Sequence, residues 1–270
     1  MISGVPRDPE FNSVTPDHPA AQRVVELRRY EFRAGQRDTF IDLFERELIE
    51  PQEDTGMRVL GQFTDIDDPD SFVWVRGFQD METRRQSLTV FYGGPVWRTH
   101  REAANATMLD SDNVLLLEPA RDDSGLNLLR LRPGLGARTS DRGAVVAGVH
   151  YLEPGAQFPA RDVFERQAVP MSATVSGSLL AYFLSHPAQN DYPALPVRDE
   201  NVLVWLVGFR NFDHLEDAWG HIGYIHRLVG ERVAANQPAE LLRLVPTTRS
   251  LIAGGGEPCR AAARLSRPTD

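Results

Sequence analysis

The sequence contains no lysine: all 29 of its lysine-or-arginine positions are arginine, which a coding bias explains most simply. Enzymes that form a Schiff base or bind pyridoxal phosphate through a lysine need its ε-amine, so the composition excludes both. Cysteine is nearly as scarce, because Cys259 is the only one. A disulfide within the chain and a zinc or iron–sulfur site built from several cysteines are therefore also excluded.

Long apolar runs are absent too. No stretch approaches the roughly 18 apolar residues of a membrane-spanning helix, and the N-terminus has no apolar core typical of a secretory signal. The formal net charge of −9 disfavours nucleic acid and anionic membranes as partners, since both attract basic surfaces. We therefore expect a cytoplasmic protein that binds neither.

The common catalytic and phosphate-binding motifs are missing as well. The sequence has no GxGxxG, no P-loop, no GxSxG and no HExxH, so we expect no nucleotide cofactor and no metal. The run Gly254-Gly255-Gly256 is followed at once by Glu257-Pro258 and is typical of a spacer rather than a phosphate loop. No other cofactor is indicated.

What the sequence does contain is an internal repeat. Several short runs recur in the same order, which chance explains poorly. Phe44-Glu45-Arg46 recurs 120 residues later as Phe164-Glu165-Arg166; Trp74–Phe78 and Arg101–Asn105 recur 131 residues later as Trp205–Phe209 and Arg232–Asn236. Residues 24–30 also correspond to 145–151. The change in spacing predicts an insertion in the second copy at about 190–200.

Each copy is predicted to follow the order β-α-β-β-α-β of a ferredoxin-like unit. Strands are expected at 24–32, 57–65, 72–78 and 113–117, and at 145–152, 178–185, 201–209 and 241–245. Helices are expected at about 40–50, 80–90, 95–108, 160–168 and 213–235, the last starting at a capping box, Asp213-x-x-Glu216. A sheet with helices on one face must bury its other face, so the fold class is α+β with two repeats packed sheet to sheet as an intramolecular barrel.

The predicted organisation has five parts. Residues 1–20 form an N-terminal tail, 21–120 the first half, 121–143 a linker rich in glycine and aspartate, 144–249 the second half, and 250–270 a C-terminal tail that includes Cys259.

The first copy resembles the NIPSNAP family, a branch of the dimeric α/β-barrel superfamily. The resemblance rests on Leu27–Tyr30 with Gly35, on Phe72–Phe78, and above all on the long run Phe91–Met108 with its Gly93-Gly94-Pro95-Val96-Trp97 core. It covers about residues 22–120, whereas the second copy lacks this core and has Glu231 where the offset would place His100. It implies the barrel fold; relatives in the superfamily include cofactor-free monooxygenases, isomerases, cyclases and plain ligand binders, and fold alone does not choose among them.

Candidate site residues occur in both copies. In the second, His221 and Tyr224 share one helical face at i, i+3 and could deprotonate a phenolic or enolic substrate, with His226 nearby. In the first, His100 follows the aromatic residues Tyr92 and Trp97. The predicted catalytic residues are His221, Tyr224, His226 and His100, and the predicted substrate-binding residues are Tyr92, Trp97, Arg76, Trp74, Trp205 and Tyr182.

Arg76 has a particular position among these residues. It lies between Trp74 and Phe78, and strand alternation places all three on one face of the strand. If buried, its guanidinium needs a partner, which could be an anionic ligand or a glutamate. A packed helix face at His221–Tyr224, and a core Trp97, remain the structural alternatives.

Two functions are compatible with these observations. The first is an enzyme without nucleotide cofactor that oxygenates, isomerises or cyclises a small aromatic or apolar substrate, held between the sheets or between sheet and helices. The second is a non-catalytic small-molecule binder or an oligomeric assembly module of the NIPSNAP type, with a homodimer as a possible state.

Overall fold

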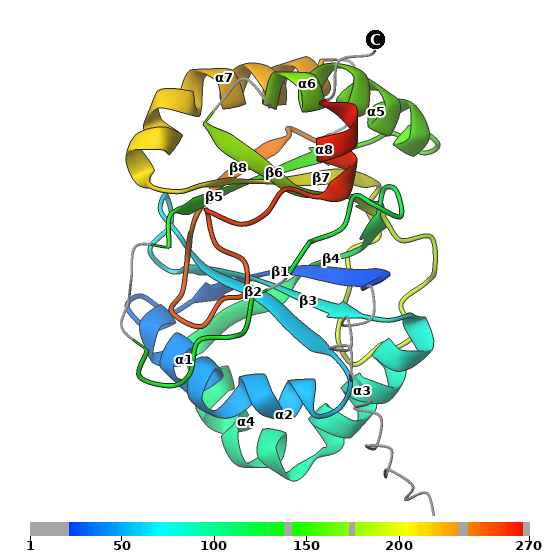
Figure 1. Cartoon of the computed structure of the whole chain (residues 1–270). Coiled ribbons are helices and arrows are strands. Elements are labelled where there is room, and N and C mark those ends of the chain that lie inside the picture. The colour runs from blue at the N-terminus through cyan, green and yellow to red at the C-terminus, as the bar shows by residue number, and fades with distance from the viewer. Residues whose placement is uncertain (1–21, 129, 138–141, 173–175, 232–236, 267–270) are drawn as a thin grey trace, which may run out of the picture.

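The computed structural model describes residues 22–128, 130–137, 142–172, 176–231 and 237–266. Within these residues, eight strands close into one antiparallel barrel in the order β1-β3-β2-β8-β5-β7-β6-β4. The two repeats stack, with one sheet face of each turned to the other and the helices on the two outer faces (Figure 1). The predicted α+β class, with two ferredoxin-like repeats packed sheet to sheet, is confirmed.

The elements follow the same order in both repeats. The first comprises β1 (Val24–Phe32), α1 (Arg37–Leu43), η1 (Phe44–Leu48), α2 (Ile49–Glu53), β2 (Arg58–Asp65), β3 (Ser71–Phe78), α3 (Met81–Gly93), α4 (Pro95–Thr107) and β4 (Met108–Pro119). The second comprises β5 (Ala144–Tyr151), α5 (Gln157–Val163), η2 (Phe164–Ala168), α6 (Val169–Ser172), β6 (Gly177–Ser185), β7 (Val202–Phe209), α7 (Phe212–Gly230) and β8 (Glu240–Pro246), followed by α8 (Arg260–Leu265).

Alternation along each strand separates two environments. Residues 25 and 27 of β1 point into the barrel, where they pack with apolar side chains of both sheets such as Val75, Val204 and Leu244. Residues 24, 30 and 32 of the same strand point outward and pack under α1, α3 and α4. The barrel interior is therefore an apolar core shared by the repeats, and each outer face has a core of its own.

The strand registers correct the predicted alignment of the repeats by one residue. Arg28 is opposite Trp74 in the β1–β3 pair, and Gly148 is opposite Trp205 in the β5–β7 pair. Arg28 thus corresponds to Gly148, and Tyr30 to His150 rather than to Tyr151. The error has a physical cause, because a one-residue slip turns every side chain to the opposite face. Tyr151 accordingly lies in the barrel core.

The repeated Phe-Glu-Arg motif forms a π-helical turn in both halves, η1 and η2. Such turns interrupt the regular hydrogen bonding of an α-helix and occur frequently at functional sites. In the first repeat, Phe44 and Leu48 lie at the two ends of this turn, and both are buried towards the sheet.

The predicted insertion lies between β6 and β7. The β2–β3 connection spans only 66–70, whereas the β6–β7 connection spans 186–201. We refer to residues 186–201 as the strap. It runs from the second repeat down to the first beside α3 (Figure 1), and its backbone bonds to β4, with His186 N donating to Leu116 O and Arg198 N to Val114 O, each at 2.9 Å.

The C-terminal segment is not the tail that the sequence indicates. Leu251 and Ile252 are buried, and Cys259 is buried at the start of α8, where its N–H donates to Leu179 O at 2.9 Å. Ile252 packs in the barrel core, with its N–H donating to Leu60 O of β2, and Cys259, Ala261 and Ala262 join the core of the second repeat. Residues 250–266 therefore belong to the folded body. The predicted tail at 1–20 lies outside the described residues.

Two element boundaries also differ from the prediction. Helix α7 begins after Asn211, whose side chain accepts a hydrogen bond from His214 N, so the expected box at Asp213 is not its cap. Strand β4 begins at Met108, five residues earlier than expected. None of the helices in the described part of the chain combines the length and apolar character that crossing a bilayer requires.

Candidate functional site

A cavity of about 400 Å³ lies between the sheet and the helices of the first repeat, outside the barrel core. Its volume falls in the range of about 300–1,000 Å³ usual for small-molecule sites. It is lined mostly by aromatic and apolar side chains: Tyr30, Phe40, Phe44, Leu48, Gln52, Trp74, Phe91, Tyr92, Trp97, Asn105, Met108, Ser111, Tyr192, Ala194 and Leu195.

The cavity walls are rigid aromatic contacts. Trp74 on β3 packs edge-on against Phe44 at 5.0 Å and against Tyr30 at 5.8 Å between ring centroids. Tyr92 at the end of α3 packs edge-on against Trp97 of α4 at 5.1 Å. Edge-to-face pairs of this kind fix ring orientation, so the cavity is preformed rather than assembled on binding.

Directly behind this wall lies a cluster of buried charges, made of Glu26, Arg28, Arg76 and Arg84. All four side chains are at most 1% exposed. Glu26 Oε2 accepts hydrogen bonds from Arg28 Nη1 and Arg76 Nε, and Oε1 accepts one from Arg84 Nε, each at 2.7 Å. Burial alone would raise the pKa of Glu26, but the three guanidinium groups outweigh it and hold that pKa well below its ordinary value.

The arginines connect the charge cluster to the cavity through two tyrosines. Arg28 Nε donates to Tyr30 Oη at 3.0 Å, and Arg76 Nη1 donates to Tyr92 Oη at 3.3 Å. Burial raises the pKa of Tyr30, and the positive charge of Arg28 offsets only part of this effect, so its phenol stays protonated at neutral pH. Because each hydroxyl oxygen already accepts from an arginine, its proton remains available to a ligand in the cavity.

The strap completes the site from the second repeat. Asp191 forms an ion pair with Arg84, and the ring of Tyr192 lies 6.3 Å from that of Tyr92 at an interplanar angle of 30°. Ala194 and Leu195 add to the lining. The spacing of the repeats predicts the insertion but does not identify its residues as part of a site. The feature of the sequence that could have indicated them is a charged residue next to an aromatic one, Asp191-Tyr192, in a proline-rich loop.

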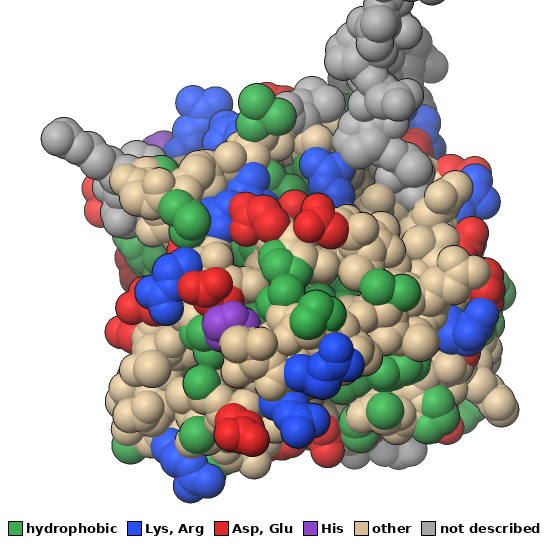
Figure 2. Space-filling model, turned by 90° about the horizontal axis from the view of Figure 1, so that it is seen from below, with side chains coloured by type: hydrophobic (Ala, Val, Ile, Leu, Met, Phe, Trp, Pro, Cys, Tyr) green, Lys and Arg blue, Asp and Glu red, His purple; other side chains and the backbone are tan. Residues whose placement is uncertain are grey.

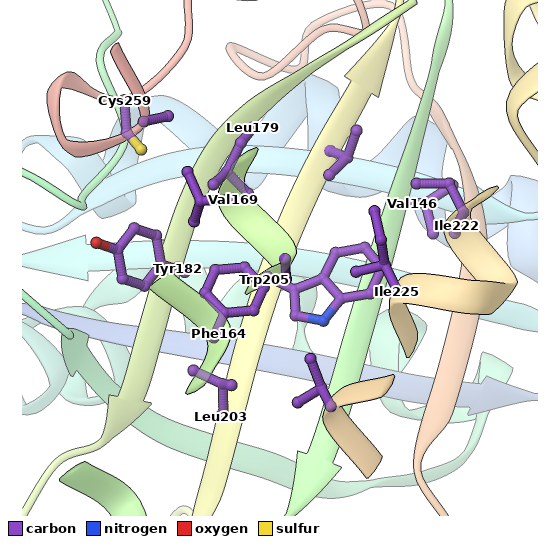
Figure 3. Close-up of a cluster of buried hydrophobic side chains, with 14 of the residues drawn as sticks. Val146, Phe164, Val169, Leu179, Tyr182, Leu203, Trp205, Ile222, Ile225 and Cys259 are labelled. Atoms are coloured by element: carbon purple, nitrogen blue, oxygen red, sulfur yellow. The ribbon is translucent and has the colours of Figure 1, made fainter. Parts of the chain in front are cut away.

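Among the described residues, the second repeat has no equivalent of this three-arginine cluster. The positions of Glu26, Arg28, Arg76 and Arg84 are occupied there by Val146, Gly148, Val207 and Leu215. Figure 3 shows Val146 and Trp205 in the resulting apolar core, together with Phe164, the counterpart of Phe44. The two repeats share a fold but differ in what lies on the outer face of the sheet.

A second, more open hollow of about 360 Å³ lies in the second repeat, lined by His150, Tyr151, His226, Arg227, Gly230, Glu231, Gln237, Pro238 and Ala239. His150 Nε2 accepts a hydrogen bond from Trp205 Nε1 at 3.0 Å, and its ring lies 4.7 Å from that of His226. Burial lowers the pKa of His150 to about 3, and His226 adds to the effect. His150 is therefore a neutral residue at physiological pH.

The structure brings together some of the predicted site residues. Trp74, Tyr92 and Trp97 line the first cavity, and Arg76 lies behind them on the same strand face as Trp74, as alternation predicted. Arg76 meets its predicted need for a partner through Glu26. His100 lies outside the cavity lining, with its Nε2 3.9 Å from a Glu47 oxygen.

The other predicted residues lie apart from this cavity. His221 and Tyr224 are on the exposed face of α7, with Tyr224 47% exposed, and neither lines the described hollows. His226 lines the second hollow. Trp205 and Tyr182 are buried in the second core, where Tyr182 Oη donates to Glu165 at 2.8 Å. Catalytic roles for His221, Tyr224, His226 and His100 stay predictions.

The described residues contain no group of three or more histidine, cysteine, aspartate or glutamate side chains arranged to hold a metal ion.

Comparison with known proteins finds a family match for the first repeat. Residues 25–121 match the NIPSNAP family model. A NIPSNAP-like domain protein from Burkholderia xenovorans is 27% identical over a match covering 35% of this chain and 83% of that one, with a TM-score of 0.33. No curated protein matches the chain.

Two solved structures resemble nearly the whole chain. A "putative monooxygenase" from Lactobacillus acidophilus has a TM-score of 0.52 at 10% identity and covers 86% of this chain and 98% of its own. An anthrone oxidase-like protein has a TM-score of 0.54 at 11% identity and covers 89% and 97%. Identities this low establish a shared fold, here of both repeats together. The first repeat thus resembles the NIPSNAP family over residues 25–121, and the two repeats together have a dimeric α/β-barrel fold built within one polypeptide.

Proposed function

We propose that the chain is an enzyme that acts without a nucleotide cofactor on a small aromatic molecule bound in the first-repeat cavity. One observation carries the proposal: an aromatic cavity of suitable size in which two tyrosine hydroxyls, those of Tyr30 and Tyr92, are held by buried arginines. Flat rings suit walls made of Trp74, Trp97 and Tyr92, and the two hydroxyls offer donors at one place on the wall.

Such donors stabilise an oxygen atom that gains negative charge during a reaction, as an oxyanion hole does. The described residues that line the cavity include no carboxylate and no imidazole. The chemistry would therefore depend on stabilising an enolate or phenolate rather than on a strong side-chain base. Substrates that ionise readily, such as phenols and ketones with an acidic methylene beside an aromatic ring, fit this requirement.

Oxygenation is the reaction that we favour. The names of the full-length structural neighbours described above point to this chemistry, and a carbanion stabilised by the tyrosines can react with O₂ without a cofactor. Loss of one methylene proton gives the carbanion, addition of O₂ and return of the proton give a hydroperoxide, and loss of water leaves a carbonyl. One methylene and one O₂ thus become one carbonyl and one water.

The test is oxygen uptake with anthrones and hydroquinones, together with ligand binding followed by quenching of tryptophan fluorescence. We expect saturable binding and turnover in the native chain. Trp97→Ala should weaken binding, and Tyr92→Phe should lower turnover by about 100–1,000-fold, because removing one oxyanion donor costs about 2.7–4 kcal/mol. Turnover lost in Tyr224→Phe but kept in Tyr92→Phe would move the chemistry to the second repeat.

A non-catalytic binder is the second candidate, and the lack of an ionisable base in the cavity lining favours it. Saturable binding of aromatic ligands without oxygen uptake or any product would support the binder over the enzyme.

A further inference from the structure

We infer that the cavity binds its ligand as an anion, with a phenolate, enolate or carboxylate oxygen accepting hydrogen bonds from Tyr30 and Tyr92. This inference rests on the proposed function, because it concerns the same cavity. It names the ligand's charge state, which the aromatic walls by themselves leave open.

The charge balance behind the wall is the first argument. Arg28, Arg76 and Arg84 carry three positive charges, whereas Glu26 and Asp191 supply two negative ones. Asp191 is also 26% exposed, so water weakens its effect on the interior. A buried positive charge that lacks a full counter-charge is costly, and an anion in the adjacent cavity would supply one.

Unpaired donors at the same place are the second argument. Among the described residues, Arg76 Nη2 and Trp74 Nε1 are buried and have no hydrogen-bond partner. Leaving a buried donor unpaired costs about 1–3 kcal/mol, and more for a charged group. Donors on both the charge cluster and the cavity wall therefore favour an acceptor, and an anionic oxygen is the strongest acceptor.

The tyrosines carry the positive field into the cavity. An arginine that donates to a phenol oxygen withdraws electron density and makes the phenol O–H a better donor. Both Tyr30 and Tyr92 are arranged in this way, by Arg28 and Arg76 respectively. Tyr92 also contributes to the raised pKa of Tyr30, which indicates that the two hydroxyls lie near each other.

The second repeat shows that the barrel does not need this cluster. There the same four positions hold Val146, Gly148, Val207 and Leu215, and the core around Val146 and Trp205 is apolar (Figure 3). Among the described residues, the buried Glu165 of that repeat pairs with a single arginine, Arg121, which is 39% exposed. Apolar packing is often as stable as a buried ion-pair network or more so. A cluster of three buried arginines at these positions in one repeat, beside the aromatic cavity, therefore points to ligand binding rather than to folding.

The positive charge of the three arginines is buried and does not form a basic patch on the face seen in Figure 2. On the face seen in Figure 2, which carries the helices of the first repeat, acidic, basic and apolar side chains are interspersed. A ligand attracted to the buried cluster would thus be held by short-range contacts, and its affinity should change little between low and moderate salt.

The experiment compares two probes of nearly the same shape, 4-nitro-1-naphthol and its methyl ether, binding to the full chain. The absorbance of the naphthol reports its ionisation directly. We expect the naphtholate to bind at least about tenfold more tightly than the ether, and the pKa of the bound naphthol to fall by about one unit or more, since tenfold in affinity equals one unit. Salt should change neither result by more than about twofold.

Variants locate the effect. Tyr92→Phe and, separately, Tyr30→Phe should remove most of the preference for the anion while leaving the affinity for the ether within about twofold. Equal affinity for naphtholate and ether in the native chain would refute the anion inference and leave the aromatic cavity intact. Binding of neither probe would count against the proposed function itself, and the anion inference would fall with it.

Discussion

Glu26 is the buried carboxylate that pairs with all three arginines of the charge cluster, and its neutralisation is the sharpest test of that cluster. In Glu26→Gln the side chain keeps its shape but loses its charge. The remaining oxygen can accept at most two of the three hydrogen bonds from Arg28, Arg76 and Arg84, and the new NH₂ group faces guanidinium donors. Three buried positive charges would then be balanced by Asp191 alone.

The expected loss of unfolding free energy is about 3–5 kcal/mol, the usual effect of breaking a buried ion pair. This is a large part of the roughly 5–15 kcal/mol that stabilises a typical domain. It corresponds to a fall in the melting temperature of the order of 10 °C for a chain of this size.

The effect has a defined pH dependence. The three arginines lower the pKa of Glu26 in the folded state below its ordinary value of 4.5, so its contribution to stability is complete above that value. The contribution is lost as the pH falls below about 4.5, towards the folded-state pKa, because the unfolded chain then binds the proton first. The difference between native chain and variant should therefore shrink on acidification.

Thermal and guanidinium unfolding at pH 7 and at pH 3.5–4.5 measures both effects. Glu82→Gln is the matched control, because it removes a carboxylate from an exposed ion pair with Arg85 and should change stability little. A loss of less than about 1 kcal/mol in Glu26→Gln, or a difference that stays constant with pH, would refute the reasoning.

Three further predictions concern the second repeat. In Gly148→Ala the added Cβ would lie 2.2 Å from the ring of Trp205, so we expect a loss of about 1–3 kcal/mol in denaturant unfolding; Gly220→Ala meets no atom within 4 Å in the middle of α7 and should instead gain about 0.5–1 kcal/mol. Burial lowers the folded-state pKa of His150 from 6.5 to about 3, so the native chain should lose up to about 1.4 kcal/mol per pH unit below 6.5, where the unfolded chain takes up the proton. His150→Gln should flatten this slope in melting curves at pH 7, 6 and 5, and parallel curves would contradict it. Burial raises the pKa of Cys259 to about 11, so its thiol should not react with a disulfide reagent until denaturant unfolds the chain; rapid labelling of the native protein would show the burial to be wrong.

Much of the fold could be predicted from the sequence, because local patterns agree with the final structure. Strand alternation around Trp74 and the repeated runs specify the sheet face and the duplication. The insertion followed from the spacing of these runs. The predicted alignment of the two copies was wrong by one residue. The valine-rich strands that begin near residues 24 and 145 can be aligned in either of two registers by sequence alone, and only the cross-strand pairing shows which register is correct.

The site was harder to predict because its chemistry depends on contacts between distant residues. Trp74, Tyr92 and Trp97 were found from an aromatic pattern within one repeat. Glu26 and Arg84 carry no local signal, since a lone charge on a strand or helix normally indicates exposure. Histidines attracted attention to the second repeat, but the charged and titratable groups beside the first cavity are arginines, tyrosines and the carboxylates Glu26 and Asp191.

The strap gives the covalent fusion of two repeats a specific consequence. Two identical separate chains with the barrel symmetry would place equivalent cavities on both outer faces, or on neither. Here only one repeat carries the long β6–β7 connection, and it reaches across to its sibling. The barrel is therefore asymmetric, and we expect a stoichiometry of one ligand per chain. If residues 22–120 were expressed alone, the cavity would lack the part of its lining that the strap provides, even if this half folded correctly.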